Sequence, residues 1–147
     1  MAAAHPRKIF VNLPVRDLDR SKAFFGGLGF SLDPRFTDDK AACMVVSDEG
    51  YVMLLRREFF ATFAAKPVGD AAKSTAGLVA LTCSNRAEVD ELVQKALAAG
   101  GSRAKDPMDH GFMYGCSFYD PDGHHWEVFW MDPAVVEQGC AERASRA

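Results

Sequence analysis

The sequence predicts an α+β domain built from two copies of a βαβββ module. The same order of elements occurs twice along the 147 residues, each helix-like segment directly follows a short apolar segment, and each copy ends in two apolar segments around a glycine. With 48% hydrophobic and 25% charged residues, the composition is that of an ordinary globular domain. We expect one domain, with modules at residues 8–56 and 76–131, a linker helix region at 57–75 and a tail at 132–147.

The first copy begins with an apolar strand from Ile9, followed by an amphipathic helix that Asp17 or Asp19 caps. The inward stripe of this helix is expected to contain Leu18, Ser21, Phe24, Phe25 and Leu28. A weaker strand at 30–36 and a hairpin at 41–56, turning at Gly50, complete the copy.

The second copy repeats this order with a strand at 78–83, a helix that starts after Ser84 and Asn85, and a stop at Gly100 and Gly101. A weaker strand at 102–106 and a hairpin at 113–130 follow. Neither copy alone can bury both faces of its sheet, so we expect the two copies to pack together.

The last hairpin contains SFYDPDGHHWEVFW, in which strand alternation places Glu127, His125 and Phe129 on one face. The opposite face should pack beneath the helices, and it carries Trp126, Val128 and Trp130. His124, at the start of the strand, is expected to point to solvent beside the turn.

Pro121 and Gly123 predict a type I turn followed by a bulge. In that register Ser117 lies opposite Glu127, and Gly115 shares their face. Small residues beside a carboxylate indicate room for a ligand. A slip of one residue would reverse this assignment.

The segments FVNLPVRDLDRSKAFFGGLGF and FYDPDGHHWEVFW resemble the two signature segments of the vicinal oxygen chelate superfamily. This superfamily includes glyoxalases, extradiol dioxygenases, methylmalonyl-CoA epimerase and bleomycin- or fosfomycin-resistance proteins. The resemblance covers about residues 8–131 and implies that the modules curl their sheets into an incomplete barrel around a cleft, usually in a homodimer.

The resemblance also implies metal ligands at four equivalent positions. Superimposing the two copies gives Phe10, Leu54, Leu78 and Glu127, with Met53 as the neighbour if the hairpins are offset by one residue. Only Glu127 has a lone pair to offer, whereas a divalent ion needs three or more oxygen or nitrogen ligands. We therefore expect no cofactor. The alternative is one divalent ion (zinc, nickel, iron or manganese) held by His110, His125 and Glu127.

Three classes of function stay open. The first is a metal-free binder of a small, partly apolar or aromatic molecule. The second is a metal-dependent, glyoxalase-like lyase, isomerase or dioxygenase with unusual ligands. The third is a metal-free enzyme in which Glu127 acts as the general base or acid beside apolar side chains. The residues expected to contact the ligand are Phe10, Asn12, Leu54, Leu78, His110, Gly115, Ser117, His125 and Phe129.

Glu127 has a further interpretation without chemistry, in which Asn12 or Ser117 simply holds it by a hydrogen bond. Phe59, Phe60 and Phe63 in the linker region are expected to anchor a short helix or, if exposed, to contact a second copy or cover the cleft.

Composition also argues against other partners. The formal charge is −3 and the 17 Lys and Arg residues are scattered, so we expect no nucleic acid. The apolar runs are too short for a membrane span, and MAAAHPRK is too short and polar for a signal peptide, which predicts a cytoplasmic protein. The four cysteines share no CxxC spacing and are expected to be reduced thiols: Cys43, Cys83, Cys116 and Cys140.

Overall fold

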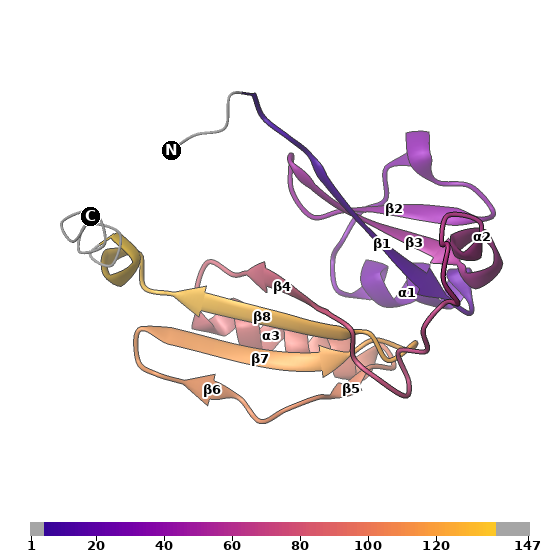
Figure 1. The fold of residues 1–147 in the computed structure, drawn as a ribbon. Helices are drawn as coiled ribbons and strands as arrows, with labels where there is room; N and C mark the ends of the chain where they lie inside the picture. The colour runs from indigo at the N-terminus through magenta and orange to yellow at the C-terminus, as the bar shows by residue number, and fades with distance from the viewer. Residues whose placement is uncertain (1–4, 138–147) are drawn as a thin grey trace.

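The computed structural model describes residues 5–137 and contains two separate β-sheets, one in each module (Figure 1). The first module consists of β1 (Ile9–Val15), α1 (Leu18–Gly27), the 3-10 helix η1 (Pro34–Phe36), β2 (Ala41–Val45) and β3 (Gly50–Arg56). Its sheet has the order β1-β3-β2, with β1 parallel and β2 antiparallel to β3. β1 is therefore an edge strand.

The strand expected at residues 30–36 is wrong in its extent, because only an isolated bridge at Leu32 and the 3-10 helix η1 are present. Pro34 lacks an N–H for a β-ladder. The Asp33 carboxylate accepts the backbone N–H of Arg35 at 3.0 Å and caps η1. This local side-chain bond replaces strand pairing.

The second module repeats the arrangement and its sheet has the order β4-β8-β7-β5, with β6 also pairing with β7. Its elements are β4 (Leu78–Thr82), α3 (Arg86–Ala98), β5 (Ser102–Arg103), β6 (Met108–Asp109), β7 (Met113–Tyr119) and β8 (His125–Met131). β4 is the edge strand that corresponds to β1. The α+β class with paired modules is confirmed, and within residues 5–137 the sheets do not join into a closed barrel.

The register predicted for the last hairpin is confirmed. Ser117 lies opposite Glu127, and Tyr119 lies opposite His125. Gly123 has a φ of 91°, the left-handed conformation that the bulge requires. The faces of β8 therefore alternate as expected, with Trp126 and Val128 buried.

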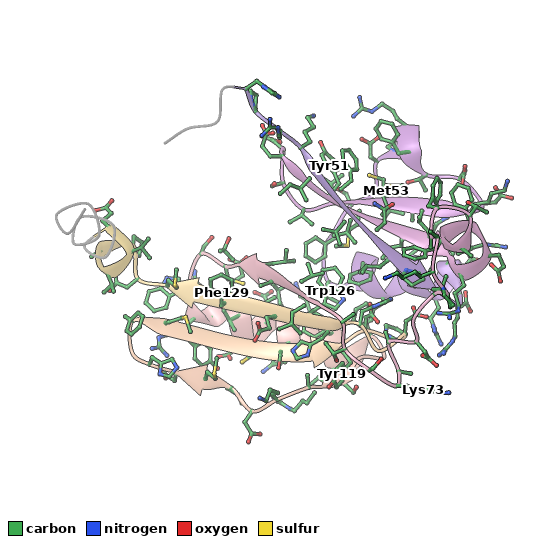
Figure 2. All side chains as sticks on the ribbon, viewed as in Figure 1. Tyr51, Met53, Lys73, Tyr119, Trp126 and Phe129 are labelled. Carbon is green, nitrogen blue, oxygen red and sulfur yellow. The ribbon has the colours of Figure 1, made fainter. Side chains whose placement is uncertain are left out.

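The two modules share one hydrophobic core, and α1 supplies the contact between them. The ring of Phe25 lies 4.9 Å from that of Trp126, and the ring of Phe24 lies 6.2 Å from that of Phe118. Trp126 is only 1% exposed and lies between the modules (Figure 2). Helix α1 of the first module thus covers part of the second sheet, and the two modules stabilise one another.

The helices begin where the sequence predicts. The Asp17 carboxylate caps α1 by accepting the Arg20 N–H, and the Asn85 side chain caps α3 by accepting the Glu88 N–H. Each cap satisfies a backbone donor that the first helical turn leaves unpaired.

A short helix, α2 (Arg57–Ala61), and an extended linker connect the modules. The Arg57 guanidinium donates to the carbonyl oxygens of Val68 and Gly69 at 3.1 and 2.8 Å, which holds the linker against α2. The tail is helical over 133–137, and its remaining residues, with Cys140, lie outside the described residues. No helix within 5–137 is both long and apolar enough to cross a membrane.

Candidate functional site

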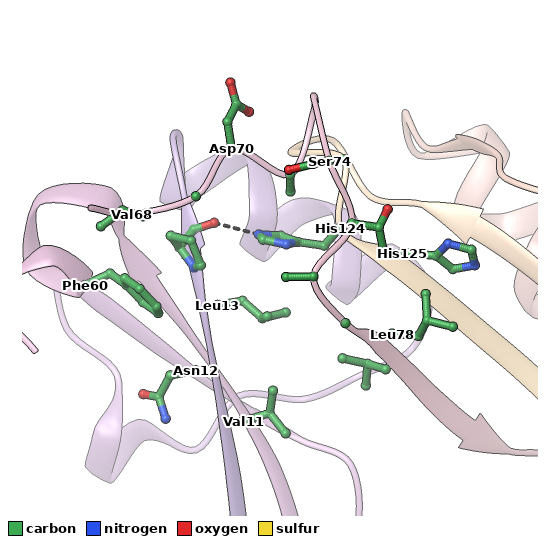
Figure 3. Close-up of a pocket in the computed structure, with 18 residues that line it drawn as sticks. Val11, Asn12, Leu13, Phe60, Val68, Asp70, Ser74, Leu78, His124 and His125 are labelled. Carbon is green, nitrogen blue, oxygen red and sulfur yellow. Dashed lines mark hydrogen bonds between the residues drawn. The ribbon is translucent and has the colours of Figure 1, made fainter. Parts of the chain in front are cut away.

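A pocket of about 330 Å³ lies where the edge strands β1 and β4 approach each other, between the linker and the start of β8 (Figure 3). This volume is within the usual range for small-molecule sites. Its apolar wall comes from both modules and the linker. The main apolar contributors are Val11, Leu13, Pro14, Phe60, Leu78 and Val79.

The turn residues Asp122 and His124 connect the second module to the first at one end of the pocket, and we call this contact the joint. The Nε2 of His124 lies 2.7 Å from the carbonyl oxygen of Pro14 in β1 (Figure 3). Because a carbonyl oxygen only accepts, Nε2 carries the proton of this hydrogen bond. The expectation that His124 points to solvent is therefore wrong. The bulge at Gly123 turns the side chain towards the first module instead of away from it.

Asp122 extends the joint onto the start of α1. This carboxylate is 5% exposed and accepts the backbone N–H of Arg16 at 2.9 Å. The Arg20 guanidinium and the Ser21 hydroxyl also donate to it, both at 3.4 Å. A carboxylate at the N-terminus of a helix is favourable because the unpaired N–H groups carry partial positive charge.

Asp120 organises the turn itself. Its Oδ1 accepts the backbone N–H groups of Asp122 and His124, and its Oδ2 accepts the Trp126 indole N–H at 3.0 Å. Burial raises the pKa of Asp120, while His124 and the indole hydrogen bond act in the opposite direction. Sequence reasoning treated this DPDG segment only as a turn and missed its role in joining the modules.

The linker closes the pocket against the same turn. A side chain at Gly123 would meet the Ala71 carbonyl oxygen at 2.9 Å and the Ala72 Cα at 3.0 Å, so the linker can lie this close only because a glycine stands there. The Asp70 carboxylate accepts from the Ala72 N–H and from the Arg16 guanidinium. Both contacts lower the pKa of Asp70, so it stays ionised and engaged with the protein.

His125 supplies a buried polar group of the pocket that has no protein partner. Its Nε2 is buried and is the only buried side-chain nitrogen or oxygen in residues 5–137 without a hydrogen bond. The ring packs edge-on against Tyr119 at 5.5 Å. An unsatisfied buried nitrogen costs free energy, and a ligand group that bonds it would recover that cost.

Of the residues predicted to contact a ligand, Asn12, Leu78 and His125 lie together in this pocket. The Asn12 amide does not reach Glu127, because its Nδ2 donates to the Phe10 carbonyl oxygen at 3.1 Å. Phe10 lies on the first sheet, 43% exposed and stacked on Tyr51.

The Glu127 group lies outside the pocket, on the face of the second sheet that the helices leave uncovered. Glu127 is half-buried, and no group in residues 5–137 bonds its carboxylate. The Ser117 hydroxyl accepts the Lys105 N–H and does not hold the glutamate. Gly115 and Phe129 face each other on the same side of this sheet.

Leu54 is placed in the core at 0% exposure, so it contacts no ligand on the open face. The paired residues of β1 and β3 show why: Phe10 pairs with Tyr51, whereas Leu78 pairs with His125. Both hairpins have five residues between equivalent pairs, Val45 with Tyr51 and Tyr119 with His125, so Gly123 corresponds to Glu49 and not to Gly50. The counterpart of Glu127 is therefore Met53, not Leu54.

His110 is exposed in the loop beside Met113, at the end of β7 that is remote from His125. Seven residues of strand separate the two ends by roughly 20 Å. This loop is held by Arg86, which donates to both Asp109 carboxylate oxygens at 2.8 Å and to the Gly111 carbonyl oxygen. The Arg86 guanidinium holds the pKa of Asp109 well below its usual range.

A family model of the Glyoxalase/Bleomycin resistance protein/Dioxygenase superfamily matches residues 9–128. The chain belongs to this superfamily. Among solved structures, it is similar to the hypothetical protein SA1046 of S. aureus, with 27% identity and a TM-score of 0.72 over 84% of this chain and 92% of that one. No curated protein matches it.

Two more distant structures support the fold alone. A glyoxalase/bleomycin resistance protein/dioxygenase family enzyme from Burkholderia phytofirmans PsJN has 20% identity and a TM-score of 0.68, covering 83% of this chain and 96% of that one. The fosfomycin resistance protein FosX from Mesorhizobium loti has 15% identity and a TM-score of 0.62, covering 92% and 98%.

The metal that this superfamily implies does not fit the residues present. The corresponding positions are Phe10, Met53, Leu78 and Glu127, and only the last provides an oxygen ligand. The replacement set of His110, His125 and Glu127 does not converge, and no group of three His, Cys, Asp or Glu residues within 5–137 is arranged to hold an ion.

Proposed function

We propose that this protein binds a small, partly apolar molecule in the pocket between β1 and β4, without a resident metal ion. The observation that carries the proposal is the combination in that pocket of a mostly apolar wall and one buried nitrogen, His125 Nε2, without a partner. Binding sites for small molecules commonly combine apolar walls with a few polar groups that orient the ligand.

The polarity of the pocket sets the kind of ligand. Asp70 and His124 already bond to other parts of the protein, so they keep the pocket in shape and contribute little to recognition. A hydroxyl or carbonyl group of the ligand would bond His125 Nε2, which donates or accepts according to its tautomer. The rest of the ligand would contact side chains such as Leu13, Phe60 and Leu78.

A thermal-shift screen of small aromatic and aliphatic compounds tests this function. A ligand that binds only the folded state raises the melting temperature by mass action. His125→Phe should weaken the compounds that carry a hydroxyl or carbonyl by about tenfold, since it removes their hydrogen bond, and should leave pure hydrocarbons unaffected.

Glu127→Gln is the matched control, because Glu127 lies outside the pocket, and every shift should persist in it. Loss of binding in Glu127→Gln but not in His125→Phe would transfer the site to the open face of the second sheet. Near-stoichiometric metal in protein purified without an affinity tag, lost in Glu127→Ala, would contradict the metal-free proposal.

We also infer that a second copy of the chain covers the open face around Glu127. Three apolar residues lie on that face, outside the pocket and without a helix above them: Met108, Phe129 and Met131. The first sheet offers a complementary surface on which Phe10 is exposed. The Lys8 ammonium lies there too, 5.6 Å from the centre of the Tyr51 ring, and its positive charge is opposite to that of Glu127. Met131→Lys should convert a dimer into a monomer in light scattering, whereas Phe63→Lys, also at an exposed apolar residue, should not.

A further inference from the structure

The free edge of β1 presents backbone hydrogen-bonding groups to the pocket. In a strand, alternate residues direct both their N–H and C=O groups to the same side. The Ile9 N–H donates to the Glu49 carbonyl oxygen at 2.8 Å, so the odd-numbered residues of β1 bond towards β3. Residues 10, 12 and 14 therefore direct their backbone groups away from β3, to the edge.

Pro14 is consistent with this parity. A proline is tolerated in a strand only where the missing N–H would face an edge, and here β1 continues through it. Its carbonyl oxygen accepts from His124 Nε2, across the edge rather than within the sheet. The N–H and C=O of Asn12 point the same way, and Asn12 lines the pocket.

The neighbouring edge positions are either occupied or lie outside the pocket. Phe10 keeps an N–H on the edge that no group in residues 5–137 bonds, but Phe10 does not line the pocket. The Phe10 carbonyl oxygen is occupied by the Asn12 side-chain amide at 3.1 Å. Pro14 has no N–H, and its carbonyl is occupied by His124. Within the pocket, one donor and one acceptor on Asn12 are thus left for a ligand, and no other group in residues 5–137 bonds them.

Asn12 is the one free edge position of β1 within the pocket, and this decides what kind of molecule suits the edge there. A full β-strand from another protein chain needs several consecutive free positions to form a ladder. One donor and one acceptor suit one amino-acid unit, whose own N–H and C=O pair with them. The apolar side chains of Leu13, Phe60 and Leu78 beside this position suit an apolar side chain or acyl group.

We propose that the pocket takes a small apolar molecule with one amino-acid-like unit, such as an N-acylated amino-acid amide, paired with the backbone N–H and C=O of Asn12. This inference rests on the proposed binding function and specifies the chemical class of its ligand. Main-chain pairing fixes the position of the unit, and the apolar wall selects its substituents.

The probe is N-acetyl-L-leucine methylamide, measured by isothermal titration calorimetry. Its comparison compound is N-acetyl-N-methyl-L-leucinamide, which has the same composition but carries the methyl group on the leucine nitrogen. Its leucine nitrogen cannot donate to the Asn12 carbonyl oxygen, so it should bind about tenfold more weakly. Equal affinity of the two compounds would overturn the proposal.

The matching variants are Asn12→Pro and Asn12→Ala. The proline removes the outward N–H without breaking the bonds between β1 and β3, because that N–H lies on the free edge. Asn12→Ala loses the same side chain and keeps the N–H. The probe should bind Asn12→Ala within about threefold of the original affinity and Asn12→Pro about tenfold more weakly. Equal binding by the two variants would contradict the pairing.

Three further outcomes separate this inference from the function on which it rests. If Asn12→Pro fails to fold by circular dichroism, the two compounds on the unaltered protein decide. If screened apolar compounds bind and the leucine probe does not, the pocket is a binding site but this ligand class is wrong. If the chain is a dimer that Asn12→Pro converts to a monomer, the edge pairs with a second copy and the inference is overturned.

Discussion

The two hairpin turns of the duplicated modules have the same place in the fold but different surroundings. In the first module, Ser47, Asp48 and Glu49 form an exposed turn on the surface. In the second, Asp120 and Asp122 are 4% and 5% exposed and bond to the other module or to the core. One copy of the hairpin is only a connection, whereas the other holds the modules together and forms one end of the pocket.

The two hairpins thus share one backbone path, but their turn residues have different roles. A polar turn at the surface and a polar turn at a joint have similar composition, because both need residues that favour tight turns. In the second module Asp122 accepts from donors of the distant α1 segment and Asp120 accepts the buried Trp126 indole N–H, so removing either carboxylate leaves donors unpaired.

Removing one carboxylate from each turn should give the largest contrast. We expect Asp122→Ala to lower the free energy of unfolding by about 2–3 kcal/mol, since it leaves the Arg16 N–H and Ser21 hydroxyl without their buried acceptor. Asp48→Ala, in the exposed turn, should leave it nearly unchanged. Urea unfolding of both variants measures the difference. Similar losses in the free energy of unfolding would show that the joint stabilises the protein no more than the exposed turn does.

The pH dependence of stability should also distinguish the turns. Burial raises the pKa of Asp120 above the value of about 3.9 for a carboxyl in the unfolded chain. At pH values between the unfolded and the native pKa, the native state therefore binds more protons than the unfolded state. Stability contributed by this group should therefore rise as pH falls through that window, by at most about 1.4 kcal/mol per pH unit.

The measurement is the free energy of unfolding of the unaltered protein minus that of Asp120→Asn, determined at pH 4 and at pH 7. The difference should be larger at pH 4, because other carboxyl groups cancel in it. A difference that shrinks at pH 4 would mean that the hydrogen bonds to Asp120 outweigh its burial. Asp48→Asn, the control in the first module, should give no such trend.

The smallest expected effect is a difference in stability between variants of the adjacent histidines His124 and His125. His124→Phe should cost about 1 kcal/mol, because it removes the hydrogen bond to the Pro14 carbonyl oxygen. His125→Phe removes a nitrogen without a partner and should leave the protein as stable or slightly more stable. Thermal unfolding of both variants measures this. An equal loss from both would indicate that His125 has a structural partner in solution.

Much of the fold could be predicted from local patterns. Strand alternation assigned Glu127 and His125 to one face and Trp126 to the other, and the turn residues predicted the bulge and the pairing of Ser117 with Glu127, all of which are confirmed. The start of each long helix was predicted to within two candidate residues, of which Asp17 and Asn85 are the caps. These features depend on neighbours a few positions apart, which a sequence displays directly.

The candidate site could be predicted only in part. Asn12, Leu78 and His125 were expected at a ligand and lie in one pocket, yet the pocket does not contain the glutamate around which the prediction was built. Leu54 was misplaced because the two copies were superimposed on Gly50 and Gly123, whereas Gly123 corresponds to Glu49. The roles of Asp122 and His124 were missed, since both depend on segments about a hundred residues away.

Residue types and their local spacing were enough to predict the duplicated architecture and the faces of the strands. The tertiary structure alone decided which free strand edges meet, which turn is buried and which nitrogen lacks a partner. Those outcomes depend on how two modules pack through α1, and packing between distant segments is set by the fit of whole surfaces.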